Sequence, residues 1–197
     1  MTLKEIEKEI LNCKKCPLYK TRTNTVAGEG NPKAKIMFIG EAPGYWEDQR
    51  GIPFCGPAGK ILDELLEKIG IKRNEIFIGN LLKCRPPENR DPKPEEISAC
   101  SPFLEKQIEI INPKIICPLG RYSMRFVFEK YGLKNELKEI SKIHGKIFEV
   151  KTLFKNIKII PFYHPAVATY HPTMKEILKK DFKILLKFIE QWQSQRK

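Results

Sequence analysis

Residues 35–44 read KIMFIGEAPG, and this stretch decides the fold class. Its four consecutive apolar residues, 36–39, predict a strand that is buried on both faces, as is typical of a parallel sheet. The chain then turns at a glycine, an acid and a proline. Residues 58–70 follow with apolar positions at helical spacing and end at Gly70. The stretch therefore predicts a strand and a helix joined by a loop with an unusual number of special residues.

The same alternation continues along the chain. Further strands are expected at 75–84, 114–120, 145–150 and 157–165, and further helices at 93–112, 121–132 and 173–193. Strands that alternate with helices at this spacing predict a parallel sheet with helices on both faces. We expect a three-layer α/β/α fold around a central sheet of four, or five, parallel strands. A chain of 197 residues is expected to form a single domain, residues 1–197.

The charge favours a polyanion as partner. The chain has 36 Lys and Arg against 24 Asp and Glu, a net charge of +12. Each phosphate that a protein neutralises releases a condensed counterion, so nucleic acid is the favoured partner. A solvated, Lys-rich surface of a heat-adapted protein is the alternative. The sequence has no run of about 18 apolar residues and no signal-peptide core near its start, so we expect a cytoplasmic protein and no membrane partner.

The spacing of the six cysteines indicates a metal site. Cys13 and Cys16 form a C-x2-C pair in a polar turn, and Cys84 and Cys100 stand alone further along the chain. Four thiolates can hold zinc or an iron–sulfur cube, and these residue types do not choose between the two. The remaining cysteines, Cys55 and Cys117, are expected to be buried thiols.

Three stretches place polar groups at the carboxyl ends of predicted strands, where α/β sheets bind their ligands. They are the turn of Gly40, Glu41 and Ala42, the amide of Asn80, and the imidazole of His164. Of the other histidines, His171 is expected to be peripheral, and His144 to be structural or near the backbone of a bound strand. Phe54 lies between Pro53 and Gly56, so a turn rather than the core is expected to hold its ring.

Together these stretches resemble a known family. GEAPGYWEDQRGIPFCGPAG (40–59), GNLLKCRPPENRDP (79–92), IHGKIF (143–148) and YHPA (163–166), with four cysteines at these positions, are similar to family 4 uracil-DNA glycosylases. These are the iron–sulfur enzymes of thermophilic bacteria and archaea. The resemblance implies a hydrolase of base excision repair that cuts the N-glycosidic bond of uracil in DNA. It implies release of free uracil and an abasic site that is left uncut. It also implies a structural 4Fe–4S cluster, held by Cys13, Cys16, Cys84 and Cys100.

The resemblance gives the site residues their roles. A uracil that has swung out of the DNA stack would lie on the ring of Phe54 while the amide of Asn80 reads its N3–H and O4. Backbone N–H groups of residues 40–42 and a hydrogen bond from His164 would stabilise the negative charge that develops on uracil O2. Either a neutral or a charged imidazole could do this.

The residue that activates water stays open. The best-known members of the superfamily carry an aspartate where this chain has Ala42. Glu41 could replace it, Glu47 or Asp48 could contribute, or water could attack a well-developed oxocarbenium ion with little help from a base. We favour Glu41. By resemblance, Glu47 forms the wall that excludes the methyl group of thymine.

Loops around the same edge are expected to contact DNA. Residues 164–175 resemble the loop that fills the vacated stack, and the candidate wedges are Val167, Ala168 and Tyr170. Arg85, Arg90 and Lys93 would bind phosphate, although a solvated charged loop would look the same. The expected partner is uracil-containing DNA, single- or double-stranded, bound by a monomer. Nothing in the sequence supports a sliding clamp as a further partner.

Three other functions fit parts of the pattern. The fold and cluster could hold DNA or a polymerase without catalysis. The substrate could be a deaminated purine or mismatched uracil only. The cysteines could form a structural zinc module without a base pocket.

Overall fold

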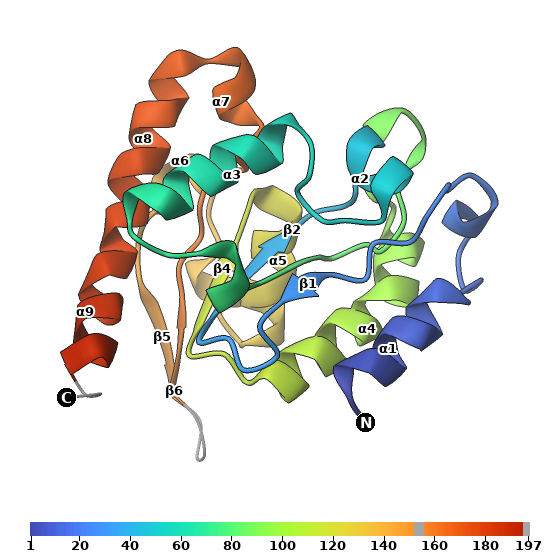
Figure 1. Cartoon of the computed structure of the whole chain (residues 1–197), viewed down its shortest axis with the longest axis horizontal. Coiled ribbons are helices and arrows are strands. Elements are labelled where there is room, and N and C mark those ends of the chain that lie inside the picture. Colours follow the sequence, from blue (N-terminus) through green and yellow to red (C-terminus); the bar gives the residue numbers. More distant parts are fainter. Residues whose placement is uncertain (152–155, 195–197) are drawn as a thin grey trace.

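The computed structural model describes residues 1–151 and 156–194 (Figure 1). Within them one six-stranded sheet has the order β1-β3-β2-β4-β6-β5. The strands are β1 (Glu29–Gly30), β2 (Ile36–Gly40), β3 (Phe77–Asn80), β4 (Ile115–Pro118), β5 (Phe148–Lys151) and β6 (Asn156–Ile159). The four central strands, β3, β2, β4 and β6, run parallel, which confirms the predicted core of the sheet.

An antiparallel strand extends the four parallel strands at each edge, so the fifth parallel strand that the sequence left open is not present in the described residues. β1 pairs antiparallel with β3, and β5 pairs antiparallel with β6. Only four residues separate β5 from β6, far fewer than the dozen or so that a parallel crossover needs. β1 is two residues long and was not predicted, because so short a strand has no readable periodicity.

Helices cover both faces of the sheet. They are α1 (Leu3–Leu11), α2 (Tyr45–Arg50), α3 (Pro57–Lys68), α4 (Pro94–Ile111), α5 (Arg121–Lys130), α6 (Ile140–Ile143), α7 (Val167–Tyr170), α8 (Pro172–Phe182) and α9 (Leu186–Ser194). The described residues also form short 3-10 turns: η1 (Pro17–Lys20), η2 (Arg73–Glu75), η3 (Pro87–Asn89), η4 (Lys134–Glu136) and η5 (Lys183–Leu185). The single closing helix predicted for 173–193 is therefore divided by η5. The predicted strand 75–84 ends early, at Asn80.

The side chains of β2 show why the fold has three layers. Phe38 packs in a core with α3, α8 and α9, and its ring stacks on Phe182 at 5.7 Å. Met37 and Ile39 point to the other face and pack with α4 and α5. A strand flanked by helices on both sides must be apolar at every position, as the sequence of this strand is. In Figure 1 the sheet lies between these two sets of helices.

The carboxyl ends of the parallel strands meet at one edge, as predicted. Gly40 and Asn80 are register partners at the ends of β2 and β3. A bridge between Leu119 and Phe162 continues the sheet beyond β4 and β6, and His164 follows two residues later. No helix in the described residues is long and apolar enough to cross a membrane.

Candidate active site and cysteine cluster

A cavity of about 330 Å³ opens at this edge of the sheet. It brings together all the residues that the sequence singled out for binding the base except Gly40, which lies directly behind the wall. The lining residues are Glu41, Ala42, Pro43, Gly44, Glu47, Phe54, Ala58, Asn80, Pro86, Asn89, Arg90, His164 and Ala166. Segments that are more than a hundred residues apart in the chain thus share one pocket.

Phe54 forms one wall in an uncommon backbone conformation. Its φ is +51°, in the left-handed region, and its side chain is only 5% exposed. The ring lies 5.5 Å from the imidazole of His164, with 29° between the two planes. A Cβ on Gly40 would come within 2.8 Å of this ring and would collide with Oδ1 of Asn80. Only glycine therefore allows strand β2 to approach both side chains.

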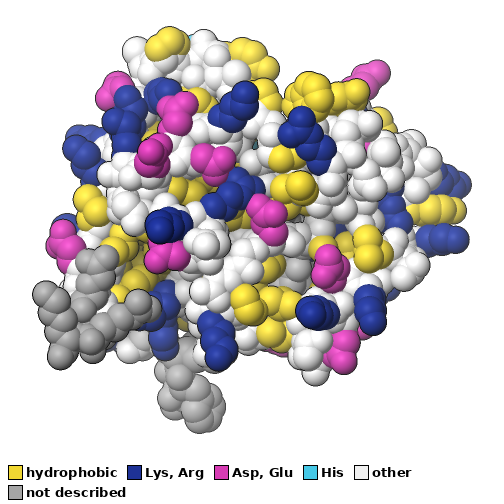
Figure 2. Space-filling model, in the orientation of Figure 1, with side chains coloured by type: hydrophobic (Ala, Val, Ile, Leu, Met, Phe, Trp, Pro, Cys, Tyr) yellow, Lys and Arg dark blue, Asp and Glu magenta, His cyan; other side chains and the backbone are white. Residues whose placement is uncertain are grey.

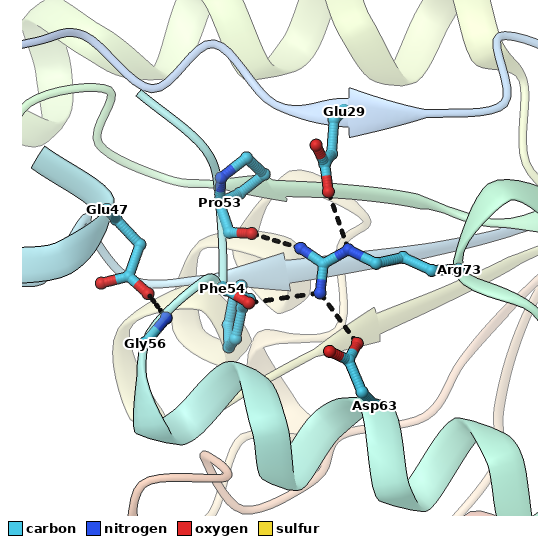
Figure 3. Close-up of polar contacts among 7 residues, drawn as sticks. All are labelled: Glu29, Glu47, Pro53, Phe54, Gly56, Asp63 and Arg73. Carbon is cyan, nitrogen blue, oxygen red and sulfur yellow. Dashed lines mark hydrogen bonds and ion pairs between the residues drawn. The ribbon is translucent and has the colours of Figure 1, made fainter. Parts of the chain in front are cut away.

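The guanidinium of Arg73 holds the turn at Phe54 (Figure 3). It donates to the main-chain carbonyls of Pro53 and Phe54, the latter at 3.2 Å. The same group donates to Glu29 of β1 at 2.7 Å and to Asp63 of α3 at 2.9 Å. These charge-assisted bonds tie the turn to a strand and a helix, so they fix where the ring of Phe54 lies.

Asn80 lines the cavity and carries a buried acceptor that has no partner among the described residues. Its side chain is 2% exposed, and Oδ1 is buried without a hydrogen-bond partner in the described part of the chain. A buried amide oxygen left unpaired costs about 1–3 kcal/mol, so a donor is expected at this position when the site is filled. The main-chain oxygen of Asn80 accepts from Nζ of the buried Lys83 at 2.9 Å. Lys83 in turn donates to Gln107 Oε1 at 2.7 Å, which anchors the end of β3.

The three acids near the cavity differ in what they contact. Glu41 is half-buried in the wall, and its burial, together with the nearby charge of Asp91, raises the pKa of its carboxyl group. Glu47 also lines the cavity, but its Oε1 accepts from the main-chain N–H of Gly56 at 2.8 Å (Figure 3). Asp48 is not among the lining residues, and its carboxylate accepts from the main-chain N–H groups of Thr23 and Asn24. Its role is to hold that loop.

His164 is held in one tautomer. Its Nδ1 accepts a hydrogen bond from the main-chain N–H of Ala166 at 3.2 Å, so the proton of the neutral ring lies on Nε2. Burial lowers the pKa of this imidazole to about 4. Of the two forms left open by the sequence, the structure favours the neutral one. His144 bonds Asp181 at 2.7 Å and packs on Tyr163, as a structural histidine does.

The charged residues of the rim are partly engaged within the protein. Arg90 forms a two-pronged pair with the buried Glu96, at 2.6 and 2.9 Å. Removing Arg90 would leave the buried carboxylate of Glu96 without its cationic partner. Arg90 therefore has a structural role in addition to any contact with DNA. Arg85 bonds Asn89 at 2.8 Å, and Lys93 is exposed as the N-cap of α4.

The three candidate wedges also differ. Val167 and Ala168, both in α7, pack against the core formed with α3 and α8. Tyr170 is 80% exposed at the end of the same helix. A side chain that enters the base stack must be free to leave the protein surface, and this favours Tyr170.

The four cysteines of the predicted set converge on a second, small cavity between α1, η1 and α4. Cys84 and Cys100 are buried, whereas Cys13 and Cys16 are half-buried. Two N–H groups point at sulfur: the main-chain N–H of Lys83 at Cys100, 3.2 Å away, and Nη1 of Arg22 at Cys84, 3.1 Å away.

The remaining cysteines lie elsewhere. Cys117 is fully buried in β4, as expected, and burial raises the pKa of its thiol well above the ordinary value. Cys55 is half-buried in the turn after Phe54 rather than in the core. In the described residues, no three His, Cys, Asp or Glu side chains are arranged to hold a single metal ion.

Comparison with known proteins agrees with this geometry. The model of the Uracil DNA glycosylase superfamily matches residues 27–193. A type-4 uracil-DNA glycosylase of Sulfurisphaera tokodaii is 51% identical over 183 residues, which are 92% of this chain and 82% of the relative. That of Archaeoglobus fulgidus is 48% identical over 182 residues, 92% of this chain and 90% of the relative. The chain belongs to the type-4 uracil-DNA glycosylase family. The resemblance drawn from the motifs is thereby confirmed.

Two residues of this type-4 glycosylase were missed by the sequence analysis. Arg73 lies in an ordinary charged stretch, IKRNE, and nothing there indicates that its partners are carbonyls twenty residues earlier. Lys83 could have been found, because a lysine between two leucines and a candidate cysteine ligand, LLKC, is unusual in a buried segment.

We predict that His164 stays neutral at about pH 5.5, where an ordinary histidine, with a pKa of about 6.5, is mostly protonated. Its pKa in the folded protein is lowered to about 4. Between about pH 4 and 6.5, the unfolded chain therefore binds a proton on this imidazole that the folded protein does not bind. The free energy of unfolding should therefore fall as the pH drops from about 6.5 toward 4. Nitrogen NMR of the imidazoles measures the first effect, and urea unfolding of the wild type and His164→Gln the second. A ring that titrates near 6.5, or carries its proton on Nδ1, would contradict the prediction.

Proposed function

We propose that this chain hydrolyses the N-glycosidic bond of uracil in DNA, releasing uracil and leaving an abasic site, in the repair of deaminated cytosine. Membership of the type-4 family supports the reaction class. The observation that carries the proposal is the cavity that Asn80, Phe54 and His164 line together, with the Oδ1 of Asn80 left without a hydrogen-bond partner in the described residues. We also propose that residues 1–197 form one domain, because α1 packs on α4 of the same core. This domain acts as a monomer, in the cytoplasm with the DNA that it repairs.

Recognition of the base follows from the groups in the cavity. A flipped uracil lies on the ring of Phe54, since a flat aromatic face binds a base by stacking. Oδ1 of Asn80 accepts the N3–H of uracil, and the amide nitrogen donates to O4. Cytosine has an acceptor at N3, so its N3 would face the acceptor Oδ1 of Asn80 in a buried site, and no hydrogen bond would form. Glu47, held by Gly56, forms the wall beside the base that excludes the methyl group of thymine.

Stabilisation of the departing uracil falls to His164 and the turn of residues 40–42. As the glycosidic bond breaks, its electron pair moves into the base and charge grows on O2. The neutral imidazole donates from Nε2–H, and the main-chain N–H groups of the turn add further donors. Fixed donors aimed at the place where charge develops are each worth about 2.7–4 kcal/mol of barrier.

Glu41 is our choice for the group that acts on water. The carboxylate of Glu47 accepts a hydrogen bond from the main chain of Gly56, and that of Asp48 accepts from the main chain of Thr23 and Asn24. Glu41 lines the cavity, and the pKa of its carboxyl group is raised. A carboxylate with a raised pKa is a stronger base, and its negative charge stabilises the oxocarbenium ion of the sugar. The proton of the attacking water passes to Glu41 as the new C–O bond forms at the sugar.

We propose that Cys13, Cys16, Cys84 and Cys100 hold a 4Fe–4S cluster. Four cysteines around one cavity are the ligand set of such a cluster, and N–H groups from Lys83 and Arg22 directed at sulfur are of the kind that stabilise thiolate ligands. When bound, the cluster would act as a structural link between the N-terminal segment, the end of β3 and α4.

DNA is held by the loops around the cavity, in our proposal. Tyr170 fills the space that the flipped base leaves, and Val167 and Ala168 support it from the core. Arg85, Arg90 and Lys93 lie along the opposite rim and neutralise phosphates of single- or double-stranded substrate. No observation favours a sliding clamp as a further partner.

The first test is release of free uracil from a labelled oligonucleotide under single-turnover conditions. We expect release by the wild type and a loss of at least about 100-fold in rate for Asn80→Ala, because the edge of the base is then unread. Asn135→Ala, a change in an exposed asparagine of η4 outside the cavity, is the matched control. DNA binding without release by the wild type would favour a binding protein, and release of hypoxanthine but not uracil would favour a different substrate.

The cluster is tested by metal analysis of the purified protein. We expect about four irons per chain with visible absorbance, and loss of both in Cys84→Ala. Cys117→Ala, a buried cysteine in β4, should keep its iron. A colourless protein with stoichiometric zinc would overturn this proposal and leave the glycosylase activity to be judged by the first test.

Arg73→Ala should impair catalysis although Arg73 does not line the cavity. The change removes the hydrogen bonds from Arg73 to the carbonyls of Pro53 and Phe54. The ring of Phe54 can then shift, and a shift of about 1 Å in a group that positions the substrate can lower the rate about 100-fold. We expect added guanidinium ion to restore part of the activity, and Arg73→Lys to restore less than the full rate. Lys72→Ala removes a neighbouring exposed cation and is the control. Lower thermal stability with an unchanged rate and no response to guanidinium would assign Arg73 a structural role only.

A further inference from the structure

Two aromatic side chains beside the cavity face solvent. Tyr45 and Trp46 are the first two residues of α2, and they are 50% and 47% exposed. Their rings meet edge to face, with centroids 5.2 Å apart and 80° between the planes. Exposure of large aromatic rings to water is unfavourable. Two such rings beside a binding cavity therefore indicate that a ligand covers them when it binds.

A guanidinium lies over each ring. The Arg85 guanidinium is 5.3 Å from the centroid of Tyr45, and that of Arg50 is 5.5 Å from the centroid of Trp46. Aromatic faces next to cations are the combination with which proteins hold unpaired nucleotides, since the ring stacks on a base while the cation neutralises its phosphate. Net charge alone does not mark the place, because Figure 2 shows Lys and Arg spread over the surface with acids among them.

These four residues are continuous with the cavity. Gly44 and Glu47, on either side of the two aromatics, line it, and so does Pro86, the residue after Arg85. Figure 1 shows α2 and α7 at the same end of the molecule, on either side of the start of α3. The helix that carries the two aromatics thus borders the cavity, on the other side of the start of α3 from α7.

We propose that Tyr45, Trp46, Arg50 and Arg85 form a shelf that binds an unpaired nucleotide next to the uracil, on the same DNA strand. Its base stacks on one of the two exposed rings, and the guanidinium groups neutralise the adjoining phosphates. The occupant is single-stranded DNA, because a neighbour that is paired within a duplex has no free face to offer. The inference rests on the proposed function, and it gives the enzyme a preference for uracil in single strands.

The test compares the wild type with Trp46→Ala on a single-stranded and a duplex oligonucleotide, each with one uracil. Stacking is worth about 1–3 kcal/mol per base, so the variant should bind the single strand about 10-fold more weakly and the duplex almost unchanged. The nucleotides on either side of the uracil are then replaced, one at a time, by an abasic spacer. At one position the spacer should weaken the wild type but not the variant.

A spectroscopic measurement needs no catalysis and keeps the native Trp46. The chain has two tryptophans, so Trp192→Phe, far from the cavity, leaves Trp46 as the sole reporter. A single strand that contains thymine in place of uracil should quench its fluorescence, and Arg85→Gln should shift the quenching to higher DNA concentration. Trp192→Phe should otherwise bind as the wild type does.

Several results would overturn the shelf. They are an equal loss of affinity for single strand and duplex, a loss that no spacer position removes, and a fluorescence that DNA leaves unchanged. If Trp46→Ala melts at a lower temperature than the wild type, the fluorescence and Arg85→Gln decide the matter. If the wild type quenches normally but releases no uracil, the proposed function fails while the shelf stands.

Discussion

The left-handed turn at Phe54 is the constraint on which the rest of the site depends. A phenylalanine at positive φ costs about 1–3 kcal/mol, and such a conformation persists only where its surroundings determine it. Here Arg73 binds the two carbonyls of the turn and links them to β1 and α3. The ring then lies against Gly40 at the end of β2 and stacks on His164. Without this turn the cavity would lose the wall on which a flat base rests.

The second organising feature is the end of β3, which serves both cavities. Asn80 closes the strand with its amide in the base cavity, and Lys83 ties the main chain of Asn80 to Gln107 of α4. Four residues after Asn80, the same segment supplies Cys84, while the N–H of Lys83 points at Cys100. Loss of the cysteine site would therefore release the segment that orients Asn80. This connection explains how a purely structural cluster could matter for recognition of the base.

The remaining polar side chains are of two kinds: some form hydrogen bonds or ion pairs within the protein, and others line the cavity. Arg90 forms an ion pair with Glu96, Asp48 accepts hydrogen bonds from a loop, and Glu47 accepts one from Gly56. These charged groups therefore stabilise the fold. Glu41 and His164 line the cavity, and the bond that Nδ1 of His164 accepts leaves the proton of the neutral ring on Nε2. The neutral imidazole can donate from Nε2–H to the negative charge that builds on O2, and it needs no protonation of a group whose pKa is lowered to about 4.

The sequence by itself determined the central strands, the residues at their carboxyl ends and the grouping of the four cysteines, because these depend on local periodicity and on residue type. It also carried the family, through motifs that lie in single stretches. The antiparallel edges, the partners of Arg73 and Arg90, and the unpaired oxygen of Asn80 were decided only by the tertiary structure. Each joins residues that are distant in the chain, or depends on which contact a side chain leaves unmade. Local pattern does not encode such contacts, since the same arginine in a loop can face solvent, phosphate or a carbonyl of its own chain.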